Sequence, residues 1–129
     1  MVEEVLRYDG PSKMEVRTIS DDITMRGKTL RKGDMAYLVQ HAANRDPEHF
    51  EEPDIFDIER EPNHHIGFGF GIHFCLGAAL ARLEGSIALE RLLTCYPDLS
   101  ADGEDPHWIP TMLSRGMESF PVSLGEARV

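Results

Sequence analysis

The sequence has few cysteines and no long hydrophobic run. Only Cys75 and Cys95 occur in 129 residues, too few for the disulfide framework of a small secreted domain. We therefore expect a reducing, cytoplasmic location. No run of about 18 apolar residues and no signal-peptide pattern is present, so we predict no membrane partner.

Basic residues are also scarce, with 13 Lys and Arg against 23 Asp and Glu and a formal net charge of −10. This balance argues against a nucleic-acid partner or an anionic membrane, which are bound through Lys and Arg contacts to phosphate. We interpret the negative charge as an aid to solubility. Internal repeats and low-complexity segments are absent, and the length allows at most one domain with a modest core.

The first segment reads as a helix that lacks an N-cap residue. Its pattern covers residues 1–8 and ends at a strong Asp-Gly-Pro breaker. Because no capping side chain precedes it, we expect the 129 residues to begin partway through a larger fold. Glu4 and Arg7 are three residues apart and can touch, although such a pair alone is usually a solvated surface pair.

The next segments change from strands to irregular chain. Alternating apolar residues and two glycine turns over 14–39 predict a small antiparallel sheet. Residues 41–67 read as an irregular meander, with a short helix starting at Asp46 and with Phe50 and Phe56 as anchors to a core.

The second half begins with the clearest helical pattern, over 76–96, which Pro97 ends. We interpret Cys95 near its end as a buried small apolar residue. Residues 99–129 predict a terminal β-hairpin and a tail, with strands near 108–113 and 119–124. The helix carries an apolar stripe made of Leu76, Leu80, Leu83 and Ile87.

A glycine-rich loop, FGFGIHFCLG at 68–77, delivers Cys75 to the head of that long helix. Backbone N–H donors in a loop freed by glycine, and the positive end of the helix dipole, both favour the thiolate form. A thiolate in this position is a metal ligand or a nucleophile. The loop alone does not say which.

Three kinds of chemistry are poorly matched by this loop. Phosphate binding would need the third glycine of a dinucleotide fingerprint or a Gly-Lys-Ser/Thr sequence, and both are missing. Nucleophilic catalysis would need a histidine base, and His73 is only two residues away. Structural zinc lacks paired-ligand spacing and would be crowded by phenylalanines, but it stays an alternative with the ligands His64, His65, His73 and Cys75.

A large, flat, apolar cofactor with one axial position fits better, and haem held by a cysteine thiolate is such a cofactor. Gly69 and Gly71 let the loop fold tightly so that N–H groups point at the sulfur of Cys75. Phe68 can shield that sulfur from water. Gly77, which has no side chain, permits close approach of the porphyrin face.

Two cationic or ionisable side chains complete the haem hypothesis. Arg17 lies in the first predicted strand and His73 lies in the loop. A strand arginine is usually solvated unless an anionic ligand lies beside it. Both residues are therefore candidate partners for the negative haem propionates.

The loop at 68–77 resembles the cysteine-ligand loop of the cytochrome P450 monooxygenases and matches every position that the family pattern specifies. Glu4-Val-Leu-Arg7 resembles the family's Glu-x-x-Arg helix. The Asn-Arg-Asp-Pro sequence at 44–47 is similar to soluble bacterial members. The segment with Phe50, Pro53, Phe56 and Arg60 resembles the one that closes the family's Glu-Arg-Arg network. The loop, the Glu-x-x-Arg helix and this segment are three ordered motifs, and together they favour a structural network over a surface pair for Glu4 and Arg7.

The resemblance implies an α+β fold for residues 1–129, as one partial domain. This would be the C-terminal, proximal portion of the cytochrome P450 fold, with a small antiparallel sheet, a meander, the cysteine-ligand loop, a long helix and a terminal β-hairpin. It implies haem b as cofactor, with Cys75 as the axial iron ligand and catalytic residue. Arg17 and His73 would bind the propionates, and the other haem-contacting residues would be Phe68, Gly69, Gly71 and Gly77.

By the same resemblance the function is oxidation of a small organic substrate by a haem-thiolate monooxygenase, with electrons from a ferredoxin- or flavodoxin-type donor. The family's distal helix and most of its substrate pocket have no counterpart in the sequence. We therefore expect little or no turnover from these residues alone. The alternative is a non-enzymatic, truncated haem-binding or protein-interaction module that self-associates through exposed apolar surface.

Overall fold

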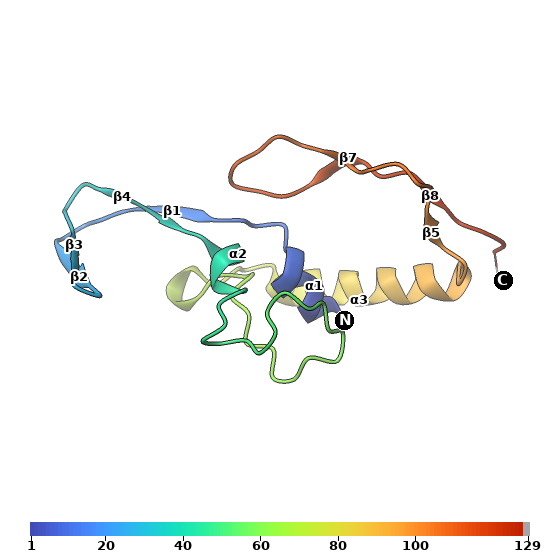
Figure 1. Ribbon diagram of the computed structural model, residues 1–129, viewed down its shortest axis with the longest axis horizontal. Helices are drawn as coiled ribbons and strands as arrows, with labels where there is room; N and C mark the ends of the chain where they lie inside the picture. Colours follow the sequence, from blue (N-terminus) through green and yellow to red (C-terminus); the bar gives the residue numbers. More distant parts are fainter. Residues whose placement is uncertain (128–129) are drawn as a thin grey trace.

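Two helices of unequal length form the centre of the chain (Figure 1). In the computed structural model, which describes residues 1–127, α1 spans Val2–Asp9 and α3 spans Ala78–Cys95. The two helices contact each other. Pro97 follows the end of α3 and cannot donate the N–H that a further helical turn needs. The sequence pattern placed the start of this helix two residues too early.

Two nested pairs of strands form an arm that extends away from α3 (Figure 1). The outer pair is β1 with β4 and the inner pair is β2 with β3, both antiparallel. The predicted sheet is thus two separate two-stranded ladders. The inner turn at Arg26-Gly27 has positive φ at both residues, as a tight hairpin turn requires. The strands are β1 Glu15–Thr18, β2 Ile23–Met25, β3 Lys28–Leu30 and β4 Met35–Leu38.

A short helix, α2 (Gln40–Ala43), leads into an irregular meander. The helix predicted to start at Asp46 is wrong, because only a turn forms there. The carbonyl of Asp46 accepts the N–H of Phe50 at 2.9 Å, but the pattern does not continue. Carbonyls further along the meander accept hydrogen bonds from Arg7 and Arg60, which hold this irregular segment in place.

The C-terminal part is a long, irregular hairpin made of two short ladders, β5 with β8 and β6 with β7. The strands expected near 108–113 and 119–124 are shorter than predicted. Pro110 and Pro121 lie inside those ranges and cannot donate to a ladder. Residues 128 and 129 of the predicted tail lie outside the described residues. The strands are β5 Ser100–Ala101, β6 His107–Trp108, β7 Met117–Ser119 and β8 Val122–Ser123.

The turn between β6 and β7 packs against the segment that follows α1. The N–H of Arg115 donates to the carbonyl of Pro11 at 2.7 Å, and the N–H of Lys13 donates to the carbonyl of Leu113 at 3.0 Å. These bonds hold the two segments side by side.

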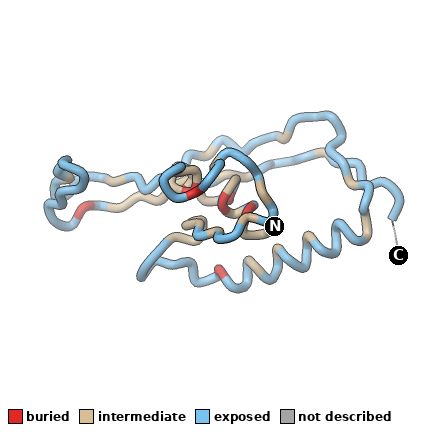
Figure 2. The backbone as a smooth tube through the Cα atoms, turned by 60° about the horizontal axis from the view of Figure 1, so that its bottom comes forward, coloured by how far each residue is buried: buried red, intermediate tan, exposed pale blue. Residues whose placement is uncertain are grey.

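Very few residues are buried (Figure 2), and most of the buried side chains are polar. Within residues 1–127 the buried apolar residues are Ile19, Phe50 and Ala78, and the buried polar residues are Glu4, Arg7, Gln40 and Asn44. The expectation that Phe50 is an anchor holds, but Phe56 is 46% exposed. Phe56 packs edge-on against Tyr8 instead.

The apolar stripe of α3 is present but nothing in the described part of the chain covers it. Leu80, Leu83 and Ile87 are each more than half exposed. Cys95, predicted to be buried, is only half-buried. The reason is that, within residues 1–127, α1 is the main element that packs on α3. No helix in residues 1–127 is long and apolar enough to cross a membrane.

Candidate functional site

The cysteine loop is closed by its own backbone. A single 3-10 turn, η1 (Gly71–His73), precedes Cys75. The N–H of Cys75 donates to the carbonyl of Phe68 at 2.9 Å, and the carbonyl of Cys75 accepts the N–H of Ala78 at 3.2 Å. Cys75 is exposed and lies just before the first turn of α3, where the helix dipole is positive.

The glycines of the loop serve two different needs. Gly69 and Gly71 have φ of +75° and +67°, in the left-handed region where other residues are strained. Gly77 has φ of −84°, which any residue can adopt. A Cβ on Gly77 would lie 3.9 Å from the sulfur of Cys75. Gly77 therefore keeps the space beside the sulfur free.

Two hollows adjoin the loop and bring most of the predicted site residues together. The first, of about 300 Å³, is lined by Arg17, Gly69 and His73, with Glu15 among the other residues. The second, of about 350 Å³, is lined by Phe68, His73 and Cys75, again with Glu15. His73 and Glu15 line both hollows, whereas Gly71 and Gly77 lie in the loop and line neither.

Arg17 is accessible but already paired. Its guanidinium contacts the carboxylate of Glu15 and donates to the carbonyl of Val16 at 2.9 Å. The side chain of Arg17 is 37% exposed. An incoming carboxylate would therefore meet a cationic group in the hollow, but it would compete with Glu15 for that group.

These residues fit a large, flat, apolar group held through sulfur. Three apolar residues close to Cys75 in the sequence are exposed: Phe70 by 85%, Ile72 by 97% and Leu76 by 102%. A free thiol, uncovered apolar side chains and an arginine for an anionic edge match the needs of haem. The zinc alternative does not fit. Within residues 1–127 no three His, Cys, Asp or Glu side chains gather to hold a metal ion.

A buried charged network joins α1 to the meander. Arg7 donates to both carboxylate oxygens of Glu4, at 2.8 Å from Nε and 2.7 Å from Nη2. Their side chains are 0% and 1% exposed. Glu4 and Arg7 are therefore not a solvated surface pair.

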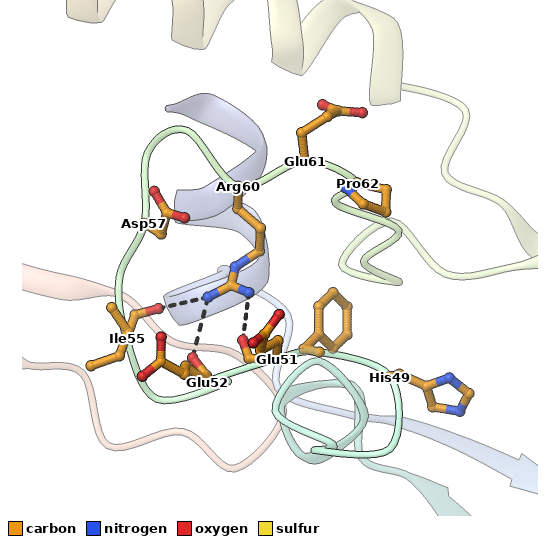
Figure 3. Close-up of a pocket in the computed structure, with 9 residues that line it drawn as sticks. His49, Glu51, Glu52, Ile55, Asp57, Arg60, Glu61 and Pro62 are labelled. Carbon is orange, nitrogen blue, oxygen red and sulfur yellow. Dashed lines mark hydrogen bonds between the residues drawn. The ribbon is translucent and has the colours of Figure 1, made fainter.

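Arg60 brings the far end of the meander to the same carboxylate. Its Nε lies 3.4 Å from Oε1 of Glu4. Figure 3 shows the rest of its guanidinium directed at the backbone carbonyls of Glu51, Glu52 and Ile55, at 2.7 to 3.2 Å. The surrounding cavity of about 380 Å³ does not include the cysteine loop. We interpret Arg60 as a structural residue that folds the meander back onto α1.

The same contacts keep Glu4 ionised. Burial by itself would raise the pKa of Glu4. The hydrogen bonds from Arg7, from the N–H of Asp57 and from Arg60 outweigh burial and lower that pKa to about 2. The charge on Glu4 is therefore present throughout the ordinary pH range.

Asn44 links this network to the segment that leads into the cysteine loop, and little in the sequence indicated this role. Its backbone carbonyl accepts a hydrogen bond from Arg7 at 2.9 Å, and its side-chain oxygen accepts the N–H of Ile66 at 2.8 Å. Asn44 is 1% exposed. Only its place in the Asn-Arg-Asp-Pro sequence marked it.

No sequence pattern predicted a second network, which consists of Glu3, His65 and Arg82. The carboxylate of Glu3 accepts hydrogen bonds from Nε and Nη2 of Arg82, at 2.7 and 2.9 Å, and lies 2.9 Å from Nε2 of His65. The hydrogen bond from Arg82 is the largest cause of a pKa of about 2 at Glu3. These residues are 62 and 79 positions apart, so no local spacing could have related them.

Comparison with known proteins shows one consistent relationship. A family model described as "Cytochrome P450" matches residues 1–117. The chain is 50% identical over 128 residues to the polyketide biosynthesis cytochrome P450 PksS of Bacillus subtilis (strain 168), covering 97% of this chain and 32% of that protein. It is 47% identical over 122 residues to the biotin biosynthesis cytochrome P450 of the same organism, covering 95% and 31%.

Solved structures agree with these relatives. The structure of Bacillus subtilis PksS matches with a TM-score of 0.92 at 49% identity, over 97% of this chain and 33% of that chain. P450BioI in complex with an acyl carrier protein ligated to hexadec-9Z-enoic acid matches with a TM-score of 0.92 at 46% identity, over 95% and 32%. The chain spans about a third of the length of these relatives.

Proposed function

The chain belongs to the cytochrome P450 family and has the α+β fold of its C-terminal portion, and we propose that it is the proximal, haem-binding part of a haem-thiolate monooxygenase. The observation that carries the proposal is the exposed thiol of Cys75 at the end of a backbone-closed loop, beside hollows that contain His73 and Arg17. The haem expected in this family is haem b.

Each residue of the loop has a role in this proposal. Cys75 would hold the iron, and Phe68 would shield the sulfur. Gly69 and Gly71 allow the tight backbone, and Gly77 leaves room for the porphyrin. Haem, when bound through a thiolate, supplies the chemistry of dioxygen activation. The protein's part is to hold the thiolate in place, exclude water from it and position the substrate.

Arg17 and His73 would bind the propionates from the hollow that they share. Their place on a strand and in the loop means that two separate elements would grip the same edge of the haem. The pairing of Arg17 with Glu15 implies that a propionate has to displace Glu15 or share the guanidinium with it. Charge-assisted hydrogen bonds of this kind are the strong ones, which makes the exchange feasible.

The proposed partners follow from the same reaction. Electrons would come from a ferredoxin- or flavodoxin-type donor, and the substrate would be a small organic molecule. Because one structural neighbour was solved with an acyl carrier protein, an acyl group on a carrier protein is a second substrate class to test. We place the reaction in the cytoplasm, in keeping with the free thiols of Cys75 and Cys95.

A second candidate function is favoured by the uncovered apolar surface. Ile72 and Leu76 are almost fully exposed, and α3 is the only helix longer than eight residues in the part of the chain that the structure describes. A surface of this kind invites association. The chain by itself would then be a non-enzymatic haem-binding or interaction module that self-associates.

Haem titration tests the first proposal. The protein is titrated with haem, reduced and exposed to carbon monoxide, and the expected result is stoichiometric binding with a thiolate-type Soret band. Absence of haem binding, or a bound haem without that band, would reject the ligand assignment. Product formation with a surrogate electron donor favours the enzyme, whereas haem binding without product and a larger mass by light scattering favour the module.

A further inference from the structure

Glu3, His65 and Arg82 come from three separate parts of the chain and meet at one carboxylate. Glu3 lies in α1, Arg82 lies in α3, and His65 lies in the segment that leads into the cysteine loop. The side chain of His65 is only 2% exposed. The carboxylate therefore ties both helices to the start of the loop.

The contacts of His65 assign its tautomer. Its Nδ1 accepts the backbone N–H of Gly67 at 3.0 Å, so this nitrogen carries a lone pair. Its Nε2, 2.9 Å from the carboxylate of Glu3, must then carry the proton and donate it. An imidazolium would place a second N–H against that of Gly67. The contact with Glu3 thus stabilises the tautomer whose Nδ1 accepts the N–H of Gly67.

The atoms around Gly67 leave no space for a side chain. A Cβ at this position would lie 2.9 Å from the carbonyl oxygen of Leu6 and 3.1 Å from Nδ1 of His65. The next residue, Phe68, has the guanidinium of Arg82 over its ring at 4.7 Å. The network therefore contacts both residues that begin the loop, one through a hydrogen bond and one through a cation–π contact.

These contacts lead directly to the cysteine. The carbonyl of Phe68 accepts the N–H of Cys75, so the position of Phe68 fixes one end of the bond that closes the loop. We propose that Glu3, His65 and Arg82 are positioning residues that set the geometry of the cysteine loop, with the hydrogen bond from Gly67 to His65 as the decisive contact. The haem part of this inference rests on the proposed function.

Two substitutions of the same histidine separate the loop contact from the carboxylate contact. In His65→Asn, the side-chain oxygen takes the place of Nδ1 and still accepts the N–H of Gly67, but it cannot reach Glu3. In His65→Gln, the side-chain NH₂ takes the place of Nε2 and still reaches Glu3, but the acceptor for Gly67 is gone. His64→Gln, at an exposed neighbour, is the matched control.

The first measurement needs no haem. Amide hydrogen exchange at Gly67 should rise by about tenfold in His65→Gln, the effect of losing one backbone hydrogen bond, and should stay near wild type in His65→Asn and His64→Gln. The nitrogen-15 shifts of His65 in the wild-type protein should show an unprotonated Nδ1. A protonated Nδ1, or equal exchange in all four proteins, would overturn the inference.

The second measurement uses haem-loaded protein. In the reduced carbon monoxide complex, His65→Gln should lose part of the thiolate-type Soret band while His65→Asn keeps it. Equal loss in both variants would assign His65 a general structural role and would overturn the loop-directed contact. If the wild type binds no haem, the proposed function fails by itself, and the exchange at Gly67 still decides the inference.

Discussion

The buried network around Arg7 and the loop around Cys75 reverse the usual placement of side chains. Arg7 and Glu4 are 0% and 1% exposed, whereas Ile72 and Leu76 are almost fully exposed. The charged groups find all their partners within the described residues. The side chains of Ile72 and Leu76 find almost none there. The charges of the network are therefore paired within this part of the chain, whereas the loop leaves apolar side chains exposed.

The physical costs explain why the two regions behave differently. A buried charge left without a partner costs several kcal/mol, so Arg7 must be satisfied wherever this part of the chain folds. Leaving an apolar side chain exposed costs far less free energy, and haem or other protein can cover it later. The comparison predicts large stability effects in the network and small ones in the loop.

Arg7→Ala should have the largest effect. It removes the five hydrogen bonds that the guanidinium donates and leaves Glu4 buried with less compensation. We expect the free energy of unfolding to fall by about 4 kcal/mol, measured by urea denaturation. Arg31→Ala is the control, because Arg31 is 71% exposed and pairs with Asp22 at the surface, and should cost below about 1 kcal/mol. Similar losses would contradict the comparison.

Acid should weaken the network around Glu4. The pKa of Glu4 is about 2 in the folded chain, against 4.5 for an ordinary glutamate. A lowered pKa means that the stabilisation is complete above pH 4.5 and disappears as the pH falls towards 2. The loss amounts to about 3 kcal/mol. Glu3, whose pKa is also about 2, contributes in the same direction.

Unfolding free energies between pH 6 and pH 2 measure this effect. Glu4→Gln should be less stable than wild type at neutral pH and should lose less stability across the acid range. A variant whose stability falls in parallel with wild type would show that Glu4 is not the group responsible.

The glycines of the loop give an intermediate effect that differs between two positions. Gly71→Ala forces a side chain to φ of +67° and should cost about 1 kcal/mol in unfolding free energy. Gly77→Ala adds an ordinary contact at 3.9 Å and should cost little, yet it should weaken haem binding because it fills the space beside the sulfur. Calorimetry and haem titration measure the two effects separately. Unchanged haem affinity in Gly77→Ala would contradict the role given to that space.

Polar substitutions in the exposed loop should have the smallest effect on stability. Ile72→Ser and Leu76→Ser remove side chains that touch little in this chain, so each should change the free energy of unfolding by less than about 0.5 kcal/mol. They should reduce self-association in light scattering, because they remove apolar surface. A large loss of stability would show that the loop is packed after all.

The sequence predicted best the features that depend on residues close together in the chain. The cysteine loop and the Glu4–Arg7 pair span few residues, and the α3 pattern gave the helix within two residues of its bounds. The contact between Glu4 and Arg7 and the closure of the cysteine loop join residues close together in the chain, which a sequence shows directly. The more distant partners Asn44 and Arg60 lie 37 and 56 positions from Arg7 and Glu4, and only the family resemblance pointed to them. The roles of Arg17, His73 and the loop glycines in haem binding stay predictions.

What the sequence could not give depends on distant contacts. The periodicity of α3 shows which face is apolar but not whether anything covers it, so Cys95 was expected to be more buried than it is. The bonds from Arg82 to Glu3 join residues 79 positions apart. The meander carbonyls accept hydrogen bonds from the side chains of Arg7 and Arg60, which no local propensity encodes.

The reduced carbon monoxide spectrum of Cys75→Ala tests the central claim most directly, with Cys95→Ala as the matched control. Both cysteines are free, but only Cys75 lies in the glycine loop. We predict that the thiolate-type Soret band is present in wild type and in Cys95→Ala and is absent in Cys75→Ala. A haem-loaded Cys75→Ala protein with the wild-type band would contradict the account.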